Sequence, residues 1–395
     1  MAGIQFFFRG QKYLVAFGGL YLLLVALLAI PYIQSQALYL NNIRLPLFAD
    51  FNNPEKYGLA PNRTVNFQIT TPDTETIGAW LVFSNSYYSS LPSIPTDPAS
   101  LIPEALSRVG EGGKRIPVVL FFHGNAATRA FTARIRHYQA FTSRLGAHVL
   151  AIDYRGFADS SGSPSEKGLT TDARAAFDWL VKEHRVHPED VLVVGHSLGT
   201  GVAGQLAAQF DEEGIKCRGF VLLSPFSSIT EVLETYNMFG FIPLMKPLYL
   251  LPGAVGLVKR AVVHRFDTLK AVPDITASVL IAHALDDWDI SHTHSDVLFQ
   301  AFIEPHLPPV EVPTNPIEVA QPEVWAKLTE QREARQLAFE KVVTKRNIDK
   351  FGTIEQFVEP QTSREVTLVK TLAGGHDYLG IQEGLVDIIG RLFDM

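Results

Sequence analysis

The sequence has little of two things that many proteins depend on, cysteine and charge. One cysteine, Cys217, stands among 395 residues, so no intramolecular disulfide can form and the fold does not require an oxidising compartment. Charged residues make up 19% of the chain and the formal net charge is -7, against roughly 25% charged residues in typical soluble domains. Because phosphate binding needs a basic surface, we expect no nucleic-acid partner.

Charge is absent altogether from one long segment near the N-terminus. No charged residue occurs between Lys12 and Arg44, and residues 14–33 read LVAFGGLYLLLVALLAIPYI. Twenty helical residues at about 1.5 Å each span roughly 30 Å, the thickness of the hydrocarbon core of a bilayer. The segment therefore predicts a transmembrane anchor over residues 13–33. A cleaved signal peptide is the alternative, although the apolar core of a signal peptide is usually about 7 to 15 residues long.

The residues that flank this anchor predict its orientation. Residues 1–12 contain Arg9 and Lys12 and no acidic residue, and positive flanking charge stays on the cytosolic side of a membrane. We therefore expect a cytosolic N-terminus over residues 1–12 and a lumenal location for the rest of the chain. Residues 34–63 form a linker to one folded domain, residues 64–395.

The folded domain begins with strand-like alternation over residues 64–83, which is broken by a Pro-Asp turn and predicts an antiparallel hairpin. Beyond it, short apolar runs alternate with helical segments. Such alternation predicts an α/β fold with a mostly parallel sheet and helices on both faces, whose functional residues lie on loops at the carboxyl ends of the strands. The apolar runs cover residues 116–124, 148–157, 190–197 and 219–226, and the helices cover residues 131–145, 170–184 and those from 198 onward.

Two long insertions interrupt this alternation. Residues 227–277 are rich in apolar side chains, but Pro243, Pro247 and Pro252 break any continuous membrane-spanning helix. We interpret this segment as a lid over an apolar pocket. Residues 303–360 begin rich in proline and continue as a charged, solvated helix with a thin apolar stripe. We assign no chemistry to this second insertion.

Residues 191–204, VLVVGHSLGTGVAG, contain two competing glycine motifs. The run from Gly199, Gly-Thr-Gly-Val-Ala-Gly, has the glycine spacing of a dinucleotide-binding loop. That loop requires a carboxylate at the end of the next strand to hold the ribose, but here the next strand ends at Ser224 without one. We therefore expect no cofactor. The run from Gly195, Gly-His-Ser-Leu-Gly, instead presents Ser197 as a nucleophile on a tight strand-to-helix turn.

A nucleophilic serine needs two partners, which the sequence also contains. A histidine must take the proton of the hydroxyl, and a carboxylate must stabilise the imidazolium that forms. In the α/β-hydrolase fold the chain order is serine, acid, histidine. The strand after the first insertion ends in a cluster that includes Asp286 and Asp287, and the last strand ends in His376. We favour Asp287 as the acid and keep Asp286 as the alternative, because spacing alone does not separate them.

Two further groups complete the predicted site. The tetrahedral oxyanion needs backbone N–H donors aimed at it, and we expect them from Leu198, next to the nucleophile, and from Asn125, in the loop after the first apolar run. His123 precedes the nucleophile and is expected to hold that loop by hydrogen bonds.

A metal site is a separate hypothesis for residues 283–296, where several histidines and aspartates lie close together. These residues have no paired metal-ligand spacing, so we expect no metal site.

With these motifs in place, the sequence resembles the α/β-hydrolase domain-containing proteins, and among them the membrane-anchored monoacylglycerol and lysophospholipid lipases. The resemblance rests on FFHGNA, DYRGFADSSG, GHSLGTGVA, HALDDWDIS and GGHDYL, spread between about Gly78 and Phe393. It implies hydrolysis of a lipid acyl ester by a protein anchored in the membrane of the endoplasmic reticulum, with its catalytic domain in the lumen. Two features depart from the family pattern and bear on substrate preference. Asp287 is followed by Trp-Asp-Ile-Ser rather than a Val-Pro ending, and the second insertion separates acid from histidine.

Other functions fit the same sequence. A serine peptidase or another carboxylesterase can use the same fold, and a catalytically silent membrane scaffold is the non-enzymatic alternative. A panel of peptide substrates separates a peptidase from a lipase. A scaffold predicts that the serine, histidine and aspartate are mispositioned or covered by an insertion. The sequence predicts no oligomeric state.

Overall fold

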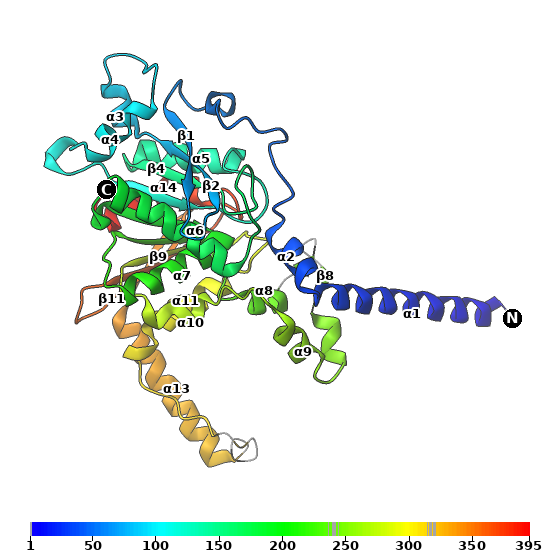
Figure 1. Ribbon diagram of the computed structural model, residues 1–395. Helices are drawn as coiled ribbons and strands as arrows, with labels where there is room; N and C mark the ends of the chain where they lie inside the picture. Colours follow the sequence, from blue (N-terminus) through cyan, green and yellow to red (C-terminus); the bar gives the residue numbers. More distant parts are fainter. Residues whose placement is uncertain are drawn as a thin grey trace.

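One ten-stranded sheet runs through the computed structural model, which describes residues 2–235, 237–238, 242–243, 245–313, 315, 318 and 321–395 (Figure 1). A separate two-stranded ribbon pairs β7 (Asn237–Met238) with β8 (Ile242–Pro243). In chain order, the strands of the large sheet are β1 (Thr64–Thr70), β2 (Thr76–Val82), β3 (Val118–Phe122), β4 (His148–Ile152), β5 (Val191–His196), β6 (Gly219–Leu223), β9 (Val279–Ala284), β10 (Val343–Ile348), β11 (Gly352–Val358) and β12 (Glu365–Thr371).

The strand order is β1-β2-β4-β3-β5-β6-β9-β12-β11-β10. The central strands from β4 to β12 run parallel, and the strands at both edges are antiparallel. The mostly parallel sheet and the hairpin expected over residues 64–83 are therefore confirmed. The carboxyl ends of β5, β9 and β12 meet at the same edge of the sheet, so the segments after His196, Ala284 and Thr371 are brought together there.

Helices cover both faces of the central strands, which explains why these strands are continuous apolar runs. In β3, Val118, Leu120 and Phe122 belong to one core, and the alternate residues Val119 and Phe121 belong to the other. The first core packs against α6 (Glu166–Asp178), α7 (Leu198–Glu212) and α11 (Thr293–Ile303), and the second against α5 (Thr132–Arg144) and α14 (Glu383–Leu392). The remaining labelled helices in the body are α3 (Asn85–Ser90), α4 (Ile102–Ser107), α8 (Ile229–Thr235), α9 (Ala254–Ala261) and α10 (Thr268–Ala271).

The apolar N-terminal segment is not one straight helix. Helix α1 (Ala2–Leu28) extends away from the body, and α2 (Pro31–Tyr39) begins after a bend of 91° (Figure 1). The bend has a local cause, because proline disfavours helical backbone in the residue before it and Ile30 is extended, with φ -78° and ψ 122°. Among the described residues no single helix is long and apolar enough to cross a bilayer, but the bent pair meets that criterion together.

This bend lies within the anchor expected over residues 13–33, whose last residues belong to α2. On α1 the apolar side chains of Phe17, Leu20 and Leu23 are more than half exposed. Of the expected cytosolic tail, Met1 and the side chains of residues 2–11, Arg9 included, lie outside the part that the structure describes.

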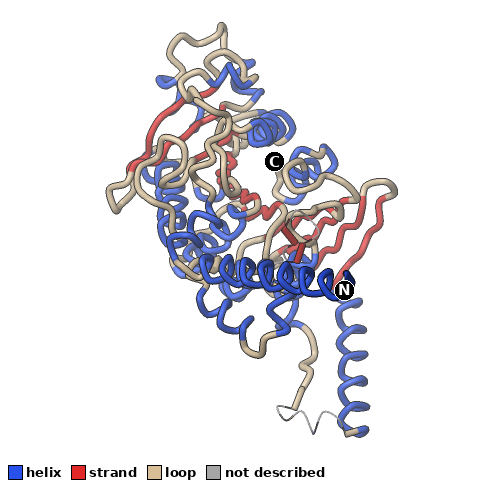
Figure 2. Tube along the Cα trace, turned by 90° about the vertical axis from the view of Figure 1, so that its right-hand side faces the viewer, coloured by secondary structure: helices blue, strands red, loops and turns tan. Residues whose placement is uncertain are grey.

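The two predicted insertions have different structures. In the second, helix α13 (Pro322–Val342) points away from the sheet (Figures 1 and 2), but residues 343–358 form β10 and β11 and pair onto β12. That part belongs to the sheet rather than to an insertion. In residues 227–277, α8 and α9 lie near α2, whereas α10 packs beside α11 and α7 (Figure 1). Residues 236, 239–241 and 244 of the expected lid lie outside the described residues.

Candidate active site

Ser197 occupies a strained turn between β5 and α7. Its backbone angles, φ 52° and ψ -119°, lie outside the regions that residues with a Cβ atom normally adopt. A Cβ added at Gly195 would collide with the carbonyl of Gly199, and one added at Gly199 would collide with the carbonyl of Phe122. Both glycines are therefore required for the turn to form. The turn presents the hydroxyl at the edge of the sheet where the carboxyl ends of the parallel strands meet.

The structure brings three of the predicted side chains into one hydrogen-bonded relay. Oγ of Ser197 lies 2.8 Å from Nε2 of His376, and Nδ1 of the same imidazole lies 2.8 Å from Oδ2 of Asp287. The side chain of Asp287 is fully buried and that of His376 is 14% exposed. This ordered and partly accessible arrangement is not the mispositioned set of residues expected of a silent scaffold.

Backbone and side-chain donors surround the carboxylate of Asp287. Oδ1 accepts hydrogen bonds from the amides of Asp289 (2.9 Å) and Ile290 (3.0 Å), and Oδ2 also lies 3.2 Å from Nε2 of His283. Burial alone would raise the pKa of Asp287, but the hydrogen bonds from His283 and His376 outweigh it and hold this pKa well below its usual range. The carboxylate therefore stays ionised at neutral pH.

The alternative acid, Asp286, lies in a different place. Its Oδ1 accepts a hydrogen bond from the amide of Gly375 at 2.8 Å, and its Oδ2 lies 3.4 Å from the amide of Gly374. The φ values of Gly374 and Gly375 are 140° and 54°, respectively. The loop before His376 therefore has a backbone conformation that favours glycine. Asp286 holds this loop, whereas Asp287 contacts the imidazole itself.

The backbone and the protonation of His376 are also constrained. Its carbonyl oxygen accepts a hydrogen bond from Nε2 of His196 (2.8 Å). Burial lowers the pKa of His196 to about 4, so this neighbour is neutral at pH 7. For His376, burial would lower the pKa, but the hydrogen bond to Asp287 and the nearby negative charges raise it above its ordinary value. An imidazole that binds a proton more readily is a stronger general base.

The amides expected to stabilise the oxyanion belong to Asn125, in the loop after β3, and to Leu198, at the start of α7. In the part of the chain that the structure describes, the amides of Asn125 and Leu198 donate no hydrogen bond to another group. Nη2 of the buried Arg134 donates to three successive carbonyls, those of Gly124, Asn125 and Ala126, at 3.2, 3.0 and 2.7 Å. These contacts fix the orientation of the loop's peptide units. His123 also holds the loop, as expected, because its Nδ1 lies 2.6 Å from the carbonyl of Gly124.

Side chains of the protein fill the space beside the glycines of the competing dinucleotide-binding motif. A Cβ added at Gly201 would lie 2.8 Å from Cβ of Phe266, and one at Gly204 would lie 3.0 Å from the side chain of Thr268. These glycines allow helix α7 to pack closely against the segment around α10. They therefore have a packing role and do not open a site for a pyrophosphate.

The acidic cluster also offers possible metal ligands. Donor atoms of Asp287, Asp289 and His376 lie within 4.8 Å of one another. Asp287 and His376 already bond to each other, and the amide of Asp289 donates to Asp287. The hydrogen bonds of the relay therefore account for this grouping without an ion.

Sequence reasoning did not assign roles to several residues around the relay. His283 lies in residues 283–296, where the sequence raises only the question of a metal site, and Arg134 lies in the helix predicted over residues 131–145. The role of Arg134 follows from its burial, because a buried cation requires compensating acceptors. A single sequence does not show which arginine is buried.

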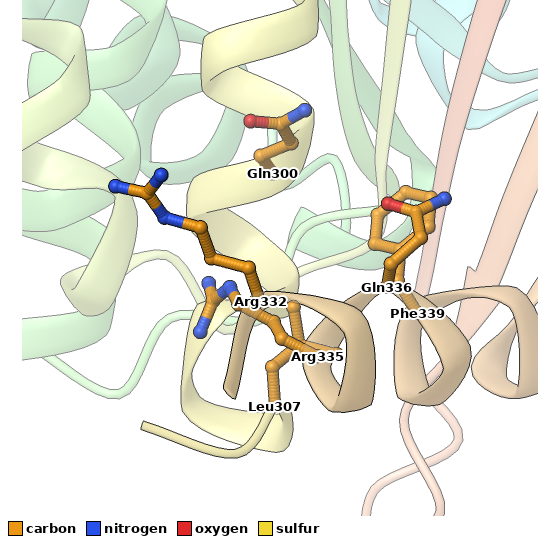
Figure 3. Close-up of a pocket in the computed structure, with 6 residues that line it drawn as sticks. All are labelled: Gln300, Leu307, Arg332, Arg335, Gln336 and Phe339. Carbon is orange, nitrogen blue, oxygen red and sulfur yellow. The ribbon is translucent and has the colours of Figure 1, made fainter. Parts of the chain in front are cut away.

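A hollow of about 160 Å³ lies apart from the relay, between α11 and α13 (Figure 3). None of the relay residues lines it. Its lining is Gln300, Leu307, Arg332, Arg335, Gln336 and Phe339.

Comparisons with known proteins agree with the fold. Residues 117–245 match the family model of the alpha/beta hydrolase fold. A solved alpha-beta hydrolase from Vibrio vulnificus superposes with a TM-score of 0.54 over 91% of this chain and 92% of its own, at 17% identity, which supports the fold alone.

Sequence relatives are more informative. Lysophosphatidylserine lipase ABHD12 of Danio rerio is 33% identical over 71% of this chain and 69% of its own length, and that of Xenopus tropicalis is 35% identical over 71% and 68%. Human protein ABHD12B is 30% identical over 67% and 68%. With this identity and coverage, the chain belongs to the α/β-hydrolase domain-containing family that includes ABHD12 and ABHD12B, and it is a serine hydrolase of the lipase type.

Proposed function

We propose that this protein is a membrane-anchored lipase that hydrolyses the acyl ester of a lysophospholipid or monoacylglycerol through Ser197, His376 and Asp287. The observation that carries the proposal is the relay itself, in which two 2.8 Å hydrogen bonds join serine, histidine and aspartate at a strained serine turn. Relatives named lysophosphatidylserine lipases favour a lysophospholipid with an anionic head group.

The first half of the reaction forms an acyl-enzyme. Oγ of Ser197 attacks the ester carbonyl while Nε2 of His376 takes the hydroxyl proton, and Asp287 stabilises the resulting imidazolium. The negative charge that develops on the carbonyl oxygen is stabilised by the amides of Asn125 and Leu198. His376 then gives its proton to the departing alkoxide, and the glycerol-containing alcohol leaves.

The second half releases the fatty acid. His376 takes a proton from a water molecule, whose oxygen attacks the acyl-enzyme carbonyl. The same two amides stabilise the second oxyanion, and Ser197 recovers its proton from the imidazolium as the bond breaks. No cofactor or metal takes part in these steps.

The N-terminal helices give this reaction its location. Helix α1 exposes a row of apolar side chains, and its cytosolic start would leave the catalytic domain on the lumenal side of the endoplasmic reticulum membrane. The segment of residues 227–277 exposes Tyr249, Leu250 and Leu257. Gln34 of α2 joins this segment to the N-terminal helices through hydrogen bonds with the backbone of Ala261 and Val263. We propose that this segment is a lid that admits an acyl chain from the bilayer.

A substrate panel tests this function. Wild-type protein and the Ser197→Ala variant in detergent micelles are given lysophosphatidylserine, lysophosphatidylcholine, monoacylglycerol and a peptide panel, and the released fatty acid or amine is measured. The proposal predicts release of fatty acid by wild type alone, with the anionic lysophospholipid preferred. Cleavage of peptides without ester hydrolysis would favour the peptidase alternative.

A further inference from the structure

The oxyanion loop is held by a segment that is distant in sequence. Three successive amides of this loop donate hydrogen bonds to carbonyls of residues 38–45. These residues comprise the last two residues of α2 and the segment that follows it, and we call them the juxtamembrane strap. The amide of Asn125, immediately before those three, is the proposed oxyanion donor. The three pairs are Ala126 to Tyr39 (2.8 Å), Ala127 to Ile43 (2.7 Å) and Thr128 to Leu45 (3.0 Å).

Side chains add to this connection. Nδ2 of Asn125 lies 3.3 Å from the carbonyl of Leu38, and Oγ1 of Thr128 donates to the carbonyl of Leu45 at 3.0 Å. The loop therefore meets the strap along its whole length, with its carbonyls facing Arg134 on the other side.

The loop needs such support because its backbone is strained. Ala126 and Ala127 have φ values of 53° and 51°, in the left-handed region that disfavours residues with a Cβ atom. Strained conformations persist only where the surrounding structure fixes them. Here the amides of these two alanines are fixed by the strap, so the geometry of the oxyanion loop depends on the strap staying in place.

The strap has its own buried attachment. Nδ2 of Asn41 donates to the carbonyl of Gly156 at 2.9 Å, and the Asn41 side chain is buried. Tyr39 is completely buried and its ring lies against His264 and Phe266. The strap is thus seated in the catalytic domain rather than lying loosely on its surface.

We propose that the juxtamembrane strap is a positioning element of the active site, which holds the amide of Asn125 where the oxyanion forms. The inference rests on the proposed function. The strap continues directly from α1 and α2, so the segment that would anchor the protein also completes its catalytic geometry. Asn41 acts through the strap and touches no reacting atom.

The test uses the full-length protein in detergent micelles with a short-chain nitrophenyl ester, whose binding does not depend on the lid. Asn41→Ala removes the buried attachment, and Asn53→Ala, which loses one exposed hydrogen bond to Asp50, is the matched control. We expect kcat of Asn41→Ala to fall about 10- to 100-fold, while KM and the midpoint of the pH–rate profile stay unchanged. Asn53→Ala should match wild type.

Hydrogen–deuterium exchange measures directly whether the strap is released from the oxyanion loop. Amides of residues 126–128 should exchange faster in Asn41→Ala than in wild type, because their acceptors on the strap are released. Faster exchange with unchanged kcat would overturn the positioning role. Unchanged exchange would overturn it as well, because the strap would not be held through Asn41.

A second pair of variants keeps the proposal testable if Asn41→Ala does not fold. Thr128→Val keeps the side-chain shape but removes the hydroxyl, which donates to the carbonyl of Leu45 and accepts from the amide of Ala130. Thr128→Ser restores a hydroxyl. We expect kcat to fall about 3- to 10-fold in Thr128→Val and to recover in Thr128→Ser. Equal kcat in both would contradict the proposal. Failure of the proposed function is recognised separately, because wild type would then show no turnover that depends on Ser197.

Discussion

Oδ2 of Asp287 lies 2.8 Å from Nδ1 of His376, although 89 positions separate the two residues in the chain. The parallel sheet is responsible, because β9 and β12 are adjacent and end at the same edge. The contact lets a buried carboxylate hold the imidazole in one orientation and stabilise its protonated form. Asp286, one residue earlier, accepts hydrogen bonds from the backbone amides of Gly374 and Gly375.

The two aspartates are therefore expected to differ in their effect on catalysis. Asp287→Asn removes the charge that stabilises the imidazolium, and kcat should fall by about 10³- to 10⁴-fold. Asp286→Asn still offers a carbonyl oxygen to Gly375 and should lower kcat by at most about tenfold. Steady-state kinetics on a nitrophenyl ester compare the two variants, and a larger loss in Asp286→Asn would reverse the assignment.

The activity should depend on pH through His376. The pKa of this imidazole is raised, and only the neutral form can take the proton of Ser197. Activity is therefore low below the pKa and rises as pH increases through it. We expect the acid limb of the kcat/KM profile to have its midpoint above about 6.5, the ordinary value of a histidine. In Asp287→Asn the residual activity should show a lower midpoint, because the carboxylate that raises the pKa is gone.

Glycine is required at position 199. A Cβ there would meet the backbone carbonyl of Phe122, which cannot move without breaking the sheet. Gly199→Ala should destabilise the protein by about 3 kcal/mol or prevent folding. Gly256→Ala on α9, where a Cβ meets nothing within 4 Å, should be neutral or stabilising by about 1 kcal/mol. Thermal unfolding of both variants checks this, and similar melting temperatures would argue against the tight turn.

The buried ion pair between Arg129 and Asp153 should be essential for stability. Nη1 of Arg129 lies 2.6 Å from Asp153, and both side chains are fully buried. Arg129→Met leaves the carboxylate buried without its cation, and we expect a loss of about 3–5 kcal/mol. Lys114→Met, which breaks an exposed pair with Asp394, should change the stability far less, because solvent screens that pair. Chemical denaturation measures both, and equal losses would contradict the expectation.

The same ion pair predicts how the stability of the fold changes as pH falls. Burial would raise the pKa of Asp153, but its hydrogen bond with His123 and the charge of Arg129 lower it below its ordinary value. A carboxyl group with a lowered pKa stabilises the fold at neutral pH, and this contribution is lost as pH falls below about 4 through the folded-state pKa. Arg129→Met should therefore show a weaker fall in stability between neutral pH and pH 3 than wild type.

Membrane attachment is expected to depend on α1. Leu20 and Leu23 are 62% and 55% exposed, and two lysines near the centre of a span cost about 2.5–3.5 kcal/mol each. The double variant Leu20→Lys, Leu23→Lys should be released from membranes by alkaline carbonate, whereas wild type stays in the pellet. Leu337→Lys on α13, an equally exposed leucine, is the control. Retention of the double variant would locate the attachment elsewhere.

Sequence patterns predicted the central strands and the order of Ser197, Asp287 and His376 because local rules govern both. Apolar runs identify buried parallel strands, and Gly195 with Gly199 identifies the serine turn. The choice between Asp286 and Asp287 could not be made, because it depends on where a loop crosses the sheet edge in space. The contact between the strap and the oxyanion loop could not be predicted either. Its hydrogen bonds use backbone carbonyls, which every residue has, so no sequence pattern marks them.

Strands β10 and β11 could not be predicted from the sequence for a different reason, although the hairpin at the other edge of the sheet was predicted. β10 exposes most of its side chains, and only Val343 is buried, so its sequence has the polarity of a surface segment. The bend before α2 could have been anticipated from Pro31, but the apolar run on both sides of the proline favoured a single span.

The most direct test of the account is labelling of the detergent-solubilised protein with a fluorophosphonate probe, which forms a covalent bond with an activated serine. We predict that wild type is labelled, that Ser197→Ala is not, and that His376→Ala is labelled far more slowly. The variants should melt within a few degrees of wild type, so that a loss of labelling reports chemistry and not unfolding. Absence of labelling in folded wild type, or labelling that persists in Ser197→Ala, would contradict the proposed catalytic relay.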